Sequence, residues 1–221
     1  MAGKERALTE AELRRSENFK VKSDDLTSKG FVRKDLTISI AKANFVGILL
    51  TLPFVAAVIT AYYLRNGNWG INRLFGDFST EYFIGLAVFV VSYIVLAAVH
   101  EGIHGFCWHF GAEHGFKDIE FGFIKENLTP YCTCSSPLSK PLYIFGSLMP
   151  MTILGIGISV VSVFIANPLV LAIGIIQIIG GSGDILISAM LLFHKMSGRD
   201  SVIIDHPTEC GLVLFEKRAA A

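Results

Sequence analysis

The sequence predicts an all-α integral membrane protein with about four transmembrane helices, and its composition and charge distribution support this fold class. Of the 221 residues, 52% are hydrophobic and only 17% are charged. A soluble domain of this length carries about a quarter charged residues. The charge is missing from long blocks of sequence, and each helix that crosses a bilayer core needs about 20 apolar residues. These blocks therefore indicate a bilayer as the solvent rather than one large soluble core.

Three blocks of the sequence are almost free of charge. The first is uncharged from Asn44 to Leu64, and the second is uncharged from Tyr82 to Val99. The third, 142–193, contains one charge, Asp184, and Asn167-Pro168 is a natural break within it. The apolar runs are continuous rather than alternating, which favours helices over barrel strands. We expect transmembrane helices at about 44–64, 83–108, 142–165 and 169–193.

The chain divides into a polar N-terminal arm (1–43), a four-helix membrane domain (44–195) and a C-terminal tail (196–221). The arm carries ten of the 19 lysine and arginine residues. Because cytoplasmic segments carry an excess of basic residues, the arm is expected on the cytoplasmic side, and an even number of helices returns the tail to that side. We therefore predict a multi-pass protein of the cell membrane with both termini in the cytoplasm.

The longest loop of the membrane domain, 110–141, contains a possible β-hairpin. Segment 119–124 is rich in β-forming residues, 127–130 is typical of a turn, and 131–134 can return as a second strand. This pattern predicts a short hairpin against the membrane face, with an irregular loop as the alternative. In the N-terminal arm, alternating polar and apolar residues at 35–40 indicate a further short strand.

The second expected helix carries a His-Glu-x-x-His motif at His100, Glu101 and His104. Residues four apart lie on the same face of an α-helix, so both imidazoles can bind one zinc ion. Glu101 can reach a water bound to that ion and act as general base. Ionisable groups at membrane depth are costly and indicate function. We therefore interpret the motif as a catalytic zinc site rather than as a solvated helix face.

A catalytic zinc site has three protein ligands and one open position, and Asp184 is the best candidate for the third ligand. Glu101 and Asp184 are the only acidic residues in the expected helices. His100 lies 17 residues after Phe83, and Asp184 lies 16 residues after Pro168, in helices of the same direction. At about 1.5 Å per residue, both lie roughly 24–26 Å along their helices. The glycine-rich sequence before Asp184 weakens the helix and permits close approach of a neighbour.

The remaining chemical groups have simpler interpretations. His206 is the main rival as third ligand, but it lies in a sequence typical of a capping turn, in which the side chain of Asp205 binds backbone amides. Cys132 and Cys134 are expected to be free thiols on the cytoplasmic side, with metal binding as the alternative. Pro150 is expected to kink the third helix.

Four motifs together resemble those of a known family, the zincin membrane peptidases, which are small bacterial multi-pass proteins. The motifs are His100-Glu101-x-x-His104-Gly105, Tyr131-Cys132-x-Cys134-x-x-Pro137-Leu138, Gly181-Ser182-Gly183-Asp184 and Asp205-His206-Pro207-Thr208. They cover roughly residues 90–211. The resemblance implies a bacterial, membrane-embedded zinc peptidase.

The motifs are also similar in plan to those of the site-2 proteases, intramembrane zinc enzymes that release membrane-bound regulators. That similarity implies His100, His104 and Asp184 as zinc ligands and Glu101 as the catalytic base. It also implies that a β-element near the site can pair with an extended substrate. The Asp-Gly motif of that group is not matched, because Ile185 follows Asp184.

The motif and the resemblances predict a zinc-dependent endopeptidase that acts within or beside the lipid bilayer on a membrane-bound or membrane-associated protein. Asn127 and Ser182 are candidates for contacts to the substrate or its oxyanion. The alternative is a membrane zinc-binding protein without protease activity, either a metal transporter or sensor or an inactive scaffold. The formal net charge is zero, so composition gives no basis for a nucleic-acid partner. The oligomeric state is left open.

Overall fold

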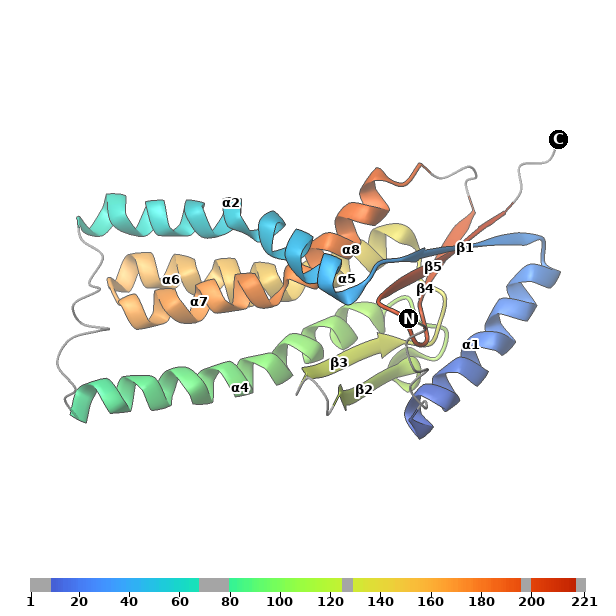
Figure 1. Cartoon of the computed structure of the whole chain (residues 1–221), viewed down its shortest axis with the longest axis horizontal. Coiled ribbons are helices and arrows are strands. Elements are labelled where there is room, and N and C mark those ends of the chain that lie inside the picture. The colour runs from blue at the N-terminus through green and yellow to red at the C-terminus, as the bar shows by residue number, and fades with distance from the viewer. Residues whose placement is uncertain (1–8, 68–79, 125–128, 196–199, 218–221) are drawn as a thin grey trace, which may run out of the picture.

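Four apolar helical segments run along the long axis of the molecule, with two small antiparallel sheets at one end (Figure 1). The computed structural model describes residues 9–67, 80–124, 129–195 and 200–217. Three helices in this part of the chain are long and apolar enough to cross a membrane, and a bent pair of helices makes a fourth candidate span. The three to four candidate spans are consistent with the prediction of about four transmembrane helices.

The helices cover the expected ranges, and the break expected at Asn167-Pro168 is present. Their bounds are α2 (Ile40–Asn66), α4 (Thr80–Trp108), α5 (Lys140–Pro150), the π-helical segment η2 (Met151–Gly157), α6 (Ile158–Ile165), α7 (Pro168–Gly180) and α8 (Ser182–Phe193). The break between α6 and α7 lies at Asn167, whose side chain accepts hydrogen bonds from the backbone N–H groups of Leu169 and Val170. Pro168 is the first residue of α7, a position where its missing N–H is not needed.

Two irregularities lie in the spans that pack around the site. The π-helical segment η2 begins directly after Pro150, where a kink was expected. The α7–α8 pair bends by 44° at its break, which is the position of Gly181. The two irregularities touch, because a Cβ built on Gly181 would lie 3.0 Å from the Cβ of Met151 in η2. The glycine-rich sequence therefore ends one helix and starts another, as its weak helix propensity predicts.

The expected β-hairpin is present. It consists of β2 (Ile119–Ile124) and β3 (Thr129–Cys134), which pair antiparallel with Ile119 opposite Cys134. The hairpin packs on the C-terminal half of α4 (Figure 1). A Cβ at Gly105 would meet the side chains of Phe121 and Ile119 at 2.7 and 2.9 Å. The missing side chain thus allows the hairpin to lie directly against the helix that carries the metal-binding motif.

A second, three-stranded sheet corrects the all-α prediction, which allowed for the hairpin and one further short strand. Its strands are β1 (Phe31–Thr37), β5 (Gly211–Lys217) and β4 (Ser201–Asp205), in the order β1-β5-β4 with antiparallel neighbours. The sequence indicated a strand in the arm, at 35–40, but none in the tail. The reason is that β5 is fully buried from Leu212 to Phe215. A strand buried on both faces shows a continuous apolar run rather than an alternating one.

Helix α1 (Glu10–Ser28) covers this sheet (Figure 1). It begins with a capping box, in which the Thr9 hydroxyl accepts from the Glu12 backbone and the Glu12 carboxylate accepts from Thr9. Phe19 of α1 packs on Phe215 of β5. The arm and the tail therefore share one hydrophobic core at the same end of the membrane helices. Which side of the membrane this end faces stays a prediction.

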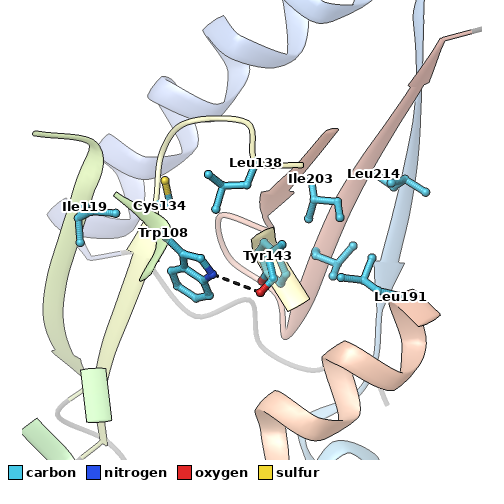
Figure 2. Close-up of a cluster of buried hydrophobic side chains, with 9 residues drawn as sticks. Trp108, Ile119, Cys134, Leu138, Tyr143, Leu191, Ile203 and Leu214 are labelled. Atoms are coloured by element: carbon cyan, nitrogen blue, oxygen red, sulfur yellow. Dashed lines mark hydrogen bonds between the residues drawn. The ribbon is translucent and has the colours of Figure 1, made fainter. Parts of the chain in front are cut away.

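A buried hydrophobic cluster joins the membrane helices to both sheets (Figure 2). Its members are Trp108, Ile119, Cys134, Leu138, Tyr143, Leu191, Ile203, Leu212 and Leu214. They come from the end of α4, the hairpin and the segment after it, α5, α8 and the strands β4 and β5. The polar segments and the apolar helices are therefore packed as one body at this end.

Candidate metal centre

Two helices bring the three predicted ligands together. His100 and His104 lie on the last turns of α4, and both are buried, with 8% and 3% of their surface exposed. Asp184 lies in the first turn of α8. Its Oδ2 is 3.1 Å from Nε2 of His100, and its Oδ1 is 3.3 Å from Nε2 of His104. Among the described residues, these three form the one group of His, Cys, Asp and Glu side chains with metal-binding spacing, all within 4.8 Å of one another.

The chemistry of this group fits zinc. Two imidazole nitrogens and one carboxylate oxygen are a donor set that zinc takes in open catalytic sites. Ligand atoms about 2.0–2.1 Å from a tetrahedral ion lie roughly 3.3 Å from one another. The distances between Asp184 and the two histidines already have this size. A bound ion would therefore require only small side-chain movements.

The ring of His104 is fixed from its second nitrogen. Nδ1 lies 2.9 Å from the backbone oxygen of Gly146 in α5, and because a carbonyl only accepts, the ring nitrogen donates. The ring also stacks on the indole of Trp108, with centroids 4.9 Å apart and planes at 14°. The indole N–H donates to the backbone oxygen of Tyr143 at 3.3 Å. A partner of this kind fixes the tautomer of a metal-binding histidine.

The predicted base, Glu101, lies between the histidines and the hairpin. Its carboxyl group lies close to Cys132 in β3. Alternate residues of a strand direct their amides to the same edge, and at this edge the Cys134 amide donates to Asp205, whereas Pro130 has no N–H. The open edge of β3 therefore offers one amide, that of Cys132, beside the predicted base.

Of the two residues predicted to contact the substrate, only Ser182 lies in the part of the chain that the structure describes. Asn127 lies outside the described residues. Ser182 is the first residue of α8, two residues before Asp184, and its backbone oxygen would lie 2.7 Å from a Cβ on Gly47. Ser182 therefore takes part in the close packing of α8 on α2. Its contact with a substrate stays a prediction.

The sequence interpretation of the Asp205-His206 segment is corrected in one respect. The turn is capped by His206, whose Nδ1 accepts from the backbone N–H groups of Thr208 and Glu209. Asp205 does not bind the turn: its Oδ1 accepts from the Tyr143 hydroxyl, and its Oδ2 accepts from the Cys134 N–H at 3.3 Å. The motif was visible in the sequence, but nothing local to it indicated these distant donors.

The two cysteines of β3 are free thiols, as expected. Burial raises the pKa of the Cys134 thiol to about 12. Burial, and secondarily the charge of Glu101, also raises the pKa of Cys132 well above its usual range. Thiolates rather than thiols bind metal ions, so both residues are better suited to packing under the hairpin than to a second metal site.

Comparison with known proteins agrees with the geometry. Residues 93–197 match the model of a family described as "Putative zincin peptidase", which is the family that the motifs resemble. No curated protein and no solved structure matches the chain. The matched segment contains all three clustered side chains and Glu101. By this match, the region that carries the candidate metal centre is similar to the zincin peptidase family.

Proposed function

We propose that the protein is a membrane-embedded zinc endopeptidase, in which His100, His104 and Asp184 hold the zinc ion and Glu101 is the catalytic base. The observation that carries the proposal is the meeting of these three side chains from two membrane-type helices, with a glutamate next to one of them in sequence. A purely structural zinc site is normally closed by four protein ligands. Three ligands and an adjacent carboxylate are typical of hydrolysis.

The residues of the site have separate tasks in this reaction. A zinc ion bound there would polarise the scissile carbonyl and lower the pKa of the attacking water. Glu101 accepts a proton from that water and donates it to the leaving amine. Asp184 and the Gly146 carbonyl keep the two imidazoles oriented.

The position of the site favours a membrane-bound or membrane-associated protein as substrate. The two histidines lie in the last third of α4, and this end of α4 is the one nearest the sheets (Figure 1). A peptide segment that leaves the bilayer at this end could extend past Glu101 and bind the outward amide of Cys132. Because β3 offers only that amide at its open edge, strand pairing would be short, and most of the binding energy must come from elsewhere.

Metal analysis of the protein purified in detergent tests the proposal. About one zinc per chain is expected in the wild type and in Glu101→Gln, and much less in Asp184→Ala. His109→Ala is the matched control: this histidine also follows the motif, but it stacks on Phe116 at the surface and should leave the metal content unchanged. A wild-type protein that takes up no zinc even after reconstitution would contradict the proposal.

Activity is the second part of the test. Glu101→Gln keeps the ligands and removes the base, so it should retain zinc, lose cleavage and trap bound membrane proteins. Cleavage of a trapped protein by the wild type, but not by Glu101→Gln, distinguishes a peptidase from a metal transporter, sensor or inactive scaffold. Equal cleavage by both would exclude Glu101 as the base.

A further inference from the structure

The carboxylate of Asp205 connects two elements that border the candidate metal centre. Asp205 is the last residue of β4, and its Oδ1 accepts a hydrogen bond from the Tyr143 hydroxyl in α5. Its Oδ2 accepts one from the backbone N–H of Cys134, the last residue of β3, at 3.3 Å. A single side chain of the C-terminal sheet therefore sets the position of a helix relative to a strand.

Tyr143, the partner of Asp205 in α5, is connected to His104 through Trp108. Tyr143 stacks on Trp108, with ring centroids 5.3 Å apart, and its backbone oxygen accepts from the Trp108 indole. Trp108 in turn stacks on His104. Further along α5, Gly146 accepts the hydrogen bond from His104. The hydrogen bond between Tyr143 and Asp205 therefore helps to position both groups that orient the His104 imidazole. These groups are the Trp108 indole and the Gly146 carbonyl.

The Cys134 amide, the partner of Asp205 in β3, lies on the strand that passes beside Glu101. Cys132 precedes Cys134 by two residues, so both amides lie on the same edge of the strand. Glu101 lies close to Cys132, and Asp205 accepts from the Cys134 amide. The loss of the hydrogen bond to Asp205 would therefore loosen β3 beside Glu101.

We infer that Asp205 is a positioning residue of the metal centre, acting through Tyr143 on His104 and through Cys134 on Glu101. Its catalytic meaning rests on the proposed function, but the geometry of the metal site and the order of β3 can be measured without a substrate. A carboxylate accepts from two donors, whereas an asparagine at the same place offers one acceptor oxygen and turns an NH2 group toward the other donor. Asp205→Asn is therefore the sharpest single change.

The control is Asp118→Asn. Asp118 is another buried carboxylate near the hairpin, where it accepts from the His114 backbone N–H and the Ser136 hydroxyl. No described hydrogen bond links its side chain to α5 or to the candidate metal centre. It can therefore report what the loss of a buried carboxylate does to the fold alone.

Cobalt binding measures the effect on the metal centre. We expect Asp205→Asn to bind cobalt about tenfold more weakly than the wild type, or weaker still, as for other residues that orient metal-binding histidines. Its visible cobalt spectrum should also change, because the imidazole moves. Tyr143→Phe, which removes one oxygen atom, should act in the same direction and carries the test alone if Asp205→Asn does not fold. Asp118→Asn should keep wild-type affinity and spectrum even if it lowers thermal stability.

Hydrogen exchange of the metal-free protein separates this inference from the proposed function. Peptides covering 129–134 and 140–150 should exchange faster in Asp205→Asn than in Asp118→Asn. A wild type that binds cobalt while Asp205→Asn binds it equally well, with the same spectrum, would overturn the inference and leave the proposed function standing. If the wild type binds no metal, the proposed function fails, and hydrogen exchange alone then tests the role of Asp205. Unchanged exchange of both peptides in Asp205→Asn would overturn the inference as well.

Discussion

The ring of His104 donates a hydrogen bond from Nδ1 to the backbone carbonyl of Gly146, 2.9 Å away on a different helix. In the neutral imidazole the proton then lies on Nδ1, and the lone pair of Nε2 points toward Asp184, 3.3 Å away. The same arrangement orients metal-binding histidines in general. Helix α5 therefore selects the tautomer that a metal ion at this site requires.

Replacing Gly146 by alanine should weaken metal binding. A Cβ at this position would collide with the indole nitrogen of Trp108, so the indole or α5 must move, and either movement disturbs the hydrogen bond to His104. We expect about tenfold weaker zinc binding, measured by competition with a chelator in detergent. Gly157→Ala is the control, because a Cβ there makes an ordinary contact, 3.6 Å from the Thr152 backbone oxygen. Equal affinities in the two variants would show that the contact is unimportant.

Gly105→Ala should destabilise the protein, whereas Gly102→Ala, one helical turn earlier, should not. A methyl group at Gly105 would lie 2.7 Å from the Phe121 ring and 2.9 Å from Ile119, so these side chains or the hairpin must shift. Overpacking of this kind costs about 1–3 kcal/mol. A methyl group at Gly102 meets nothing within 4 Å, and alanine is the better helix former by up to about 1 kcal/mol.

Thermal unfolding in detergent compares the two glycine variants directly. We expect the midpoint of Gly105→Ala to fall below that of the wild type and the midpoint of Gly102→Ala to stay level or rise. The opposite order would mean that the hairpin does not pack on α4 at Gly105. Limited proteolysis within 119–134 gives an independent measure of the same loosening, because a displaced hairpin is cleaved faster.

The membrane helices and the core of the site could be predicted from the sequence because a bilayer leaves strong local signals. A span requires a long continuous apolar run, and an acidic residue within such a run stands out. Asp184 was identified in this way, and helix rise alone placed it at the depth of His100. The structure brings the two side chains to 3.1 Å. The spacing of His100 and His104 needed only the helical repeat.

The three-stranded sheet and the contacts of Asp205 could not be predicted in this way, because their partners are distant in the chain. Phe31 pairs with Lys217, and no local pattern specifies which strands pair across such a separation. The donors to Asp205 lie 62 residues away, at Tyr143, and 71 residues away, at Cys134. The Asp205 motif was recognised, but its sequence is equally typical of an isolated turn.

Asp118→Asn should lower the free energy of unfolding at neutral pH. In acid, this difference from the wild type should disappear. Burial alone would raise the pKa of the Asp118 carboxyl, but hydrogen bonds from the Ser136 hydroxyl and the His114 backbone outweigh it, so the pKa lies below its usual range. A depressed pKa means that the charged group stabilises the fold above its unfolded pKa of about 4, and that this contribution is lost as the pH falls through the lower folded value.

The stability difference between wild type and Asp118→Asn measures this contribution. The difference should be constant from neutral pH down to about 5 and should shrink below about 4. Comparison by unfolding midpoint at each pH removes the effects of the other carboxylates, since both proteins carry them. A difference that stays constant down to pH values near 3 would show that Asp118 is not held in its charged form by Ser136 and His114.

Leu214→Ala should destabilise the protein and also loosen the metal centre, although the residue lies in the C-terminal tail. Leu214 is fully buried in β5, in the same cluster as Trp108 and Tyr143 (Figure 2). Truncation of a buried leucine costs about 2–5 kcal/mol, and here the cavity opens in the cluster that contains the indole stacked on His104. Val32→Ala on the neighbouring strand β1 is the control, because that side chain is 45% exposed and should cost less than about 0.5 kcal/mol. Weaker zinc binding in Leu214→Ala but not in Val32→Ala would show that the tail supports the site through this core. Wild-type zinc affinity in a measurably destabilised Leu214→Ala would instead mean that α4, α5 and α8 hold the metal ligands without help from the sheet.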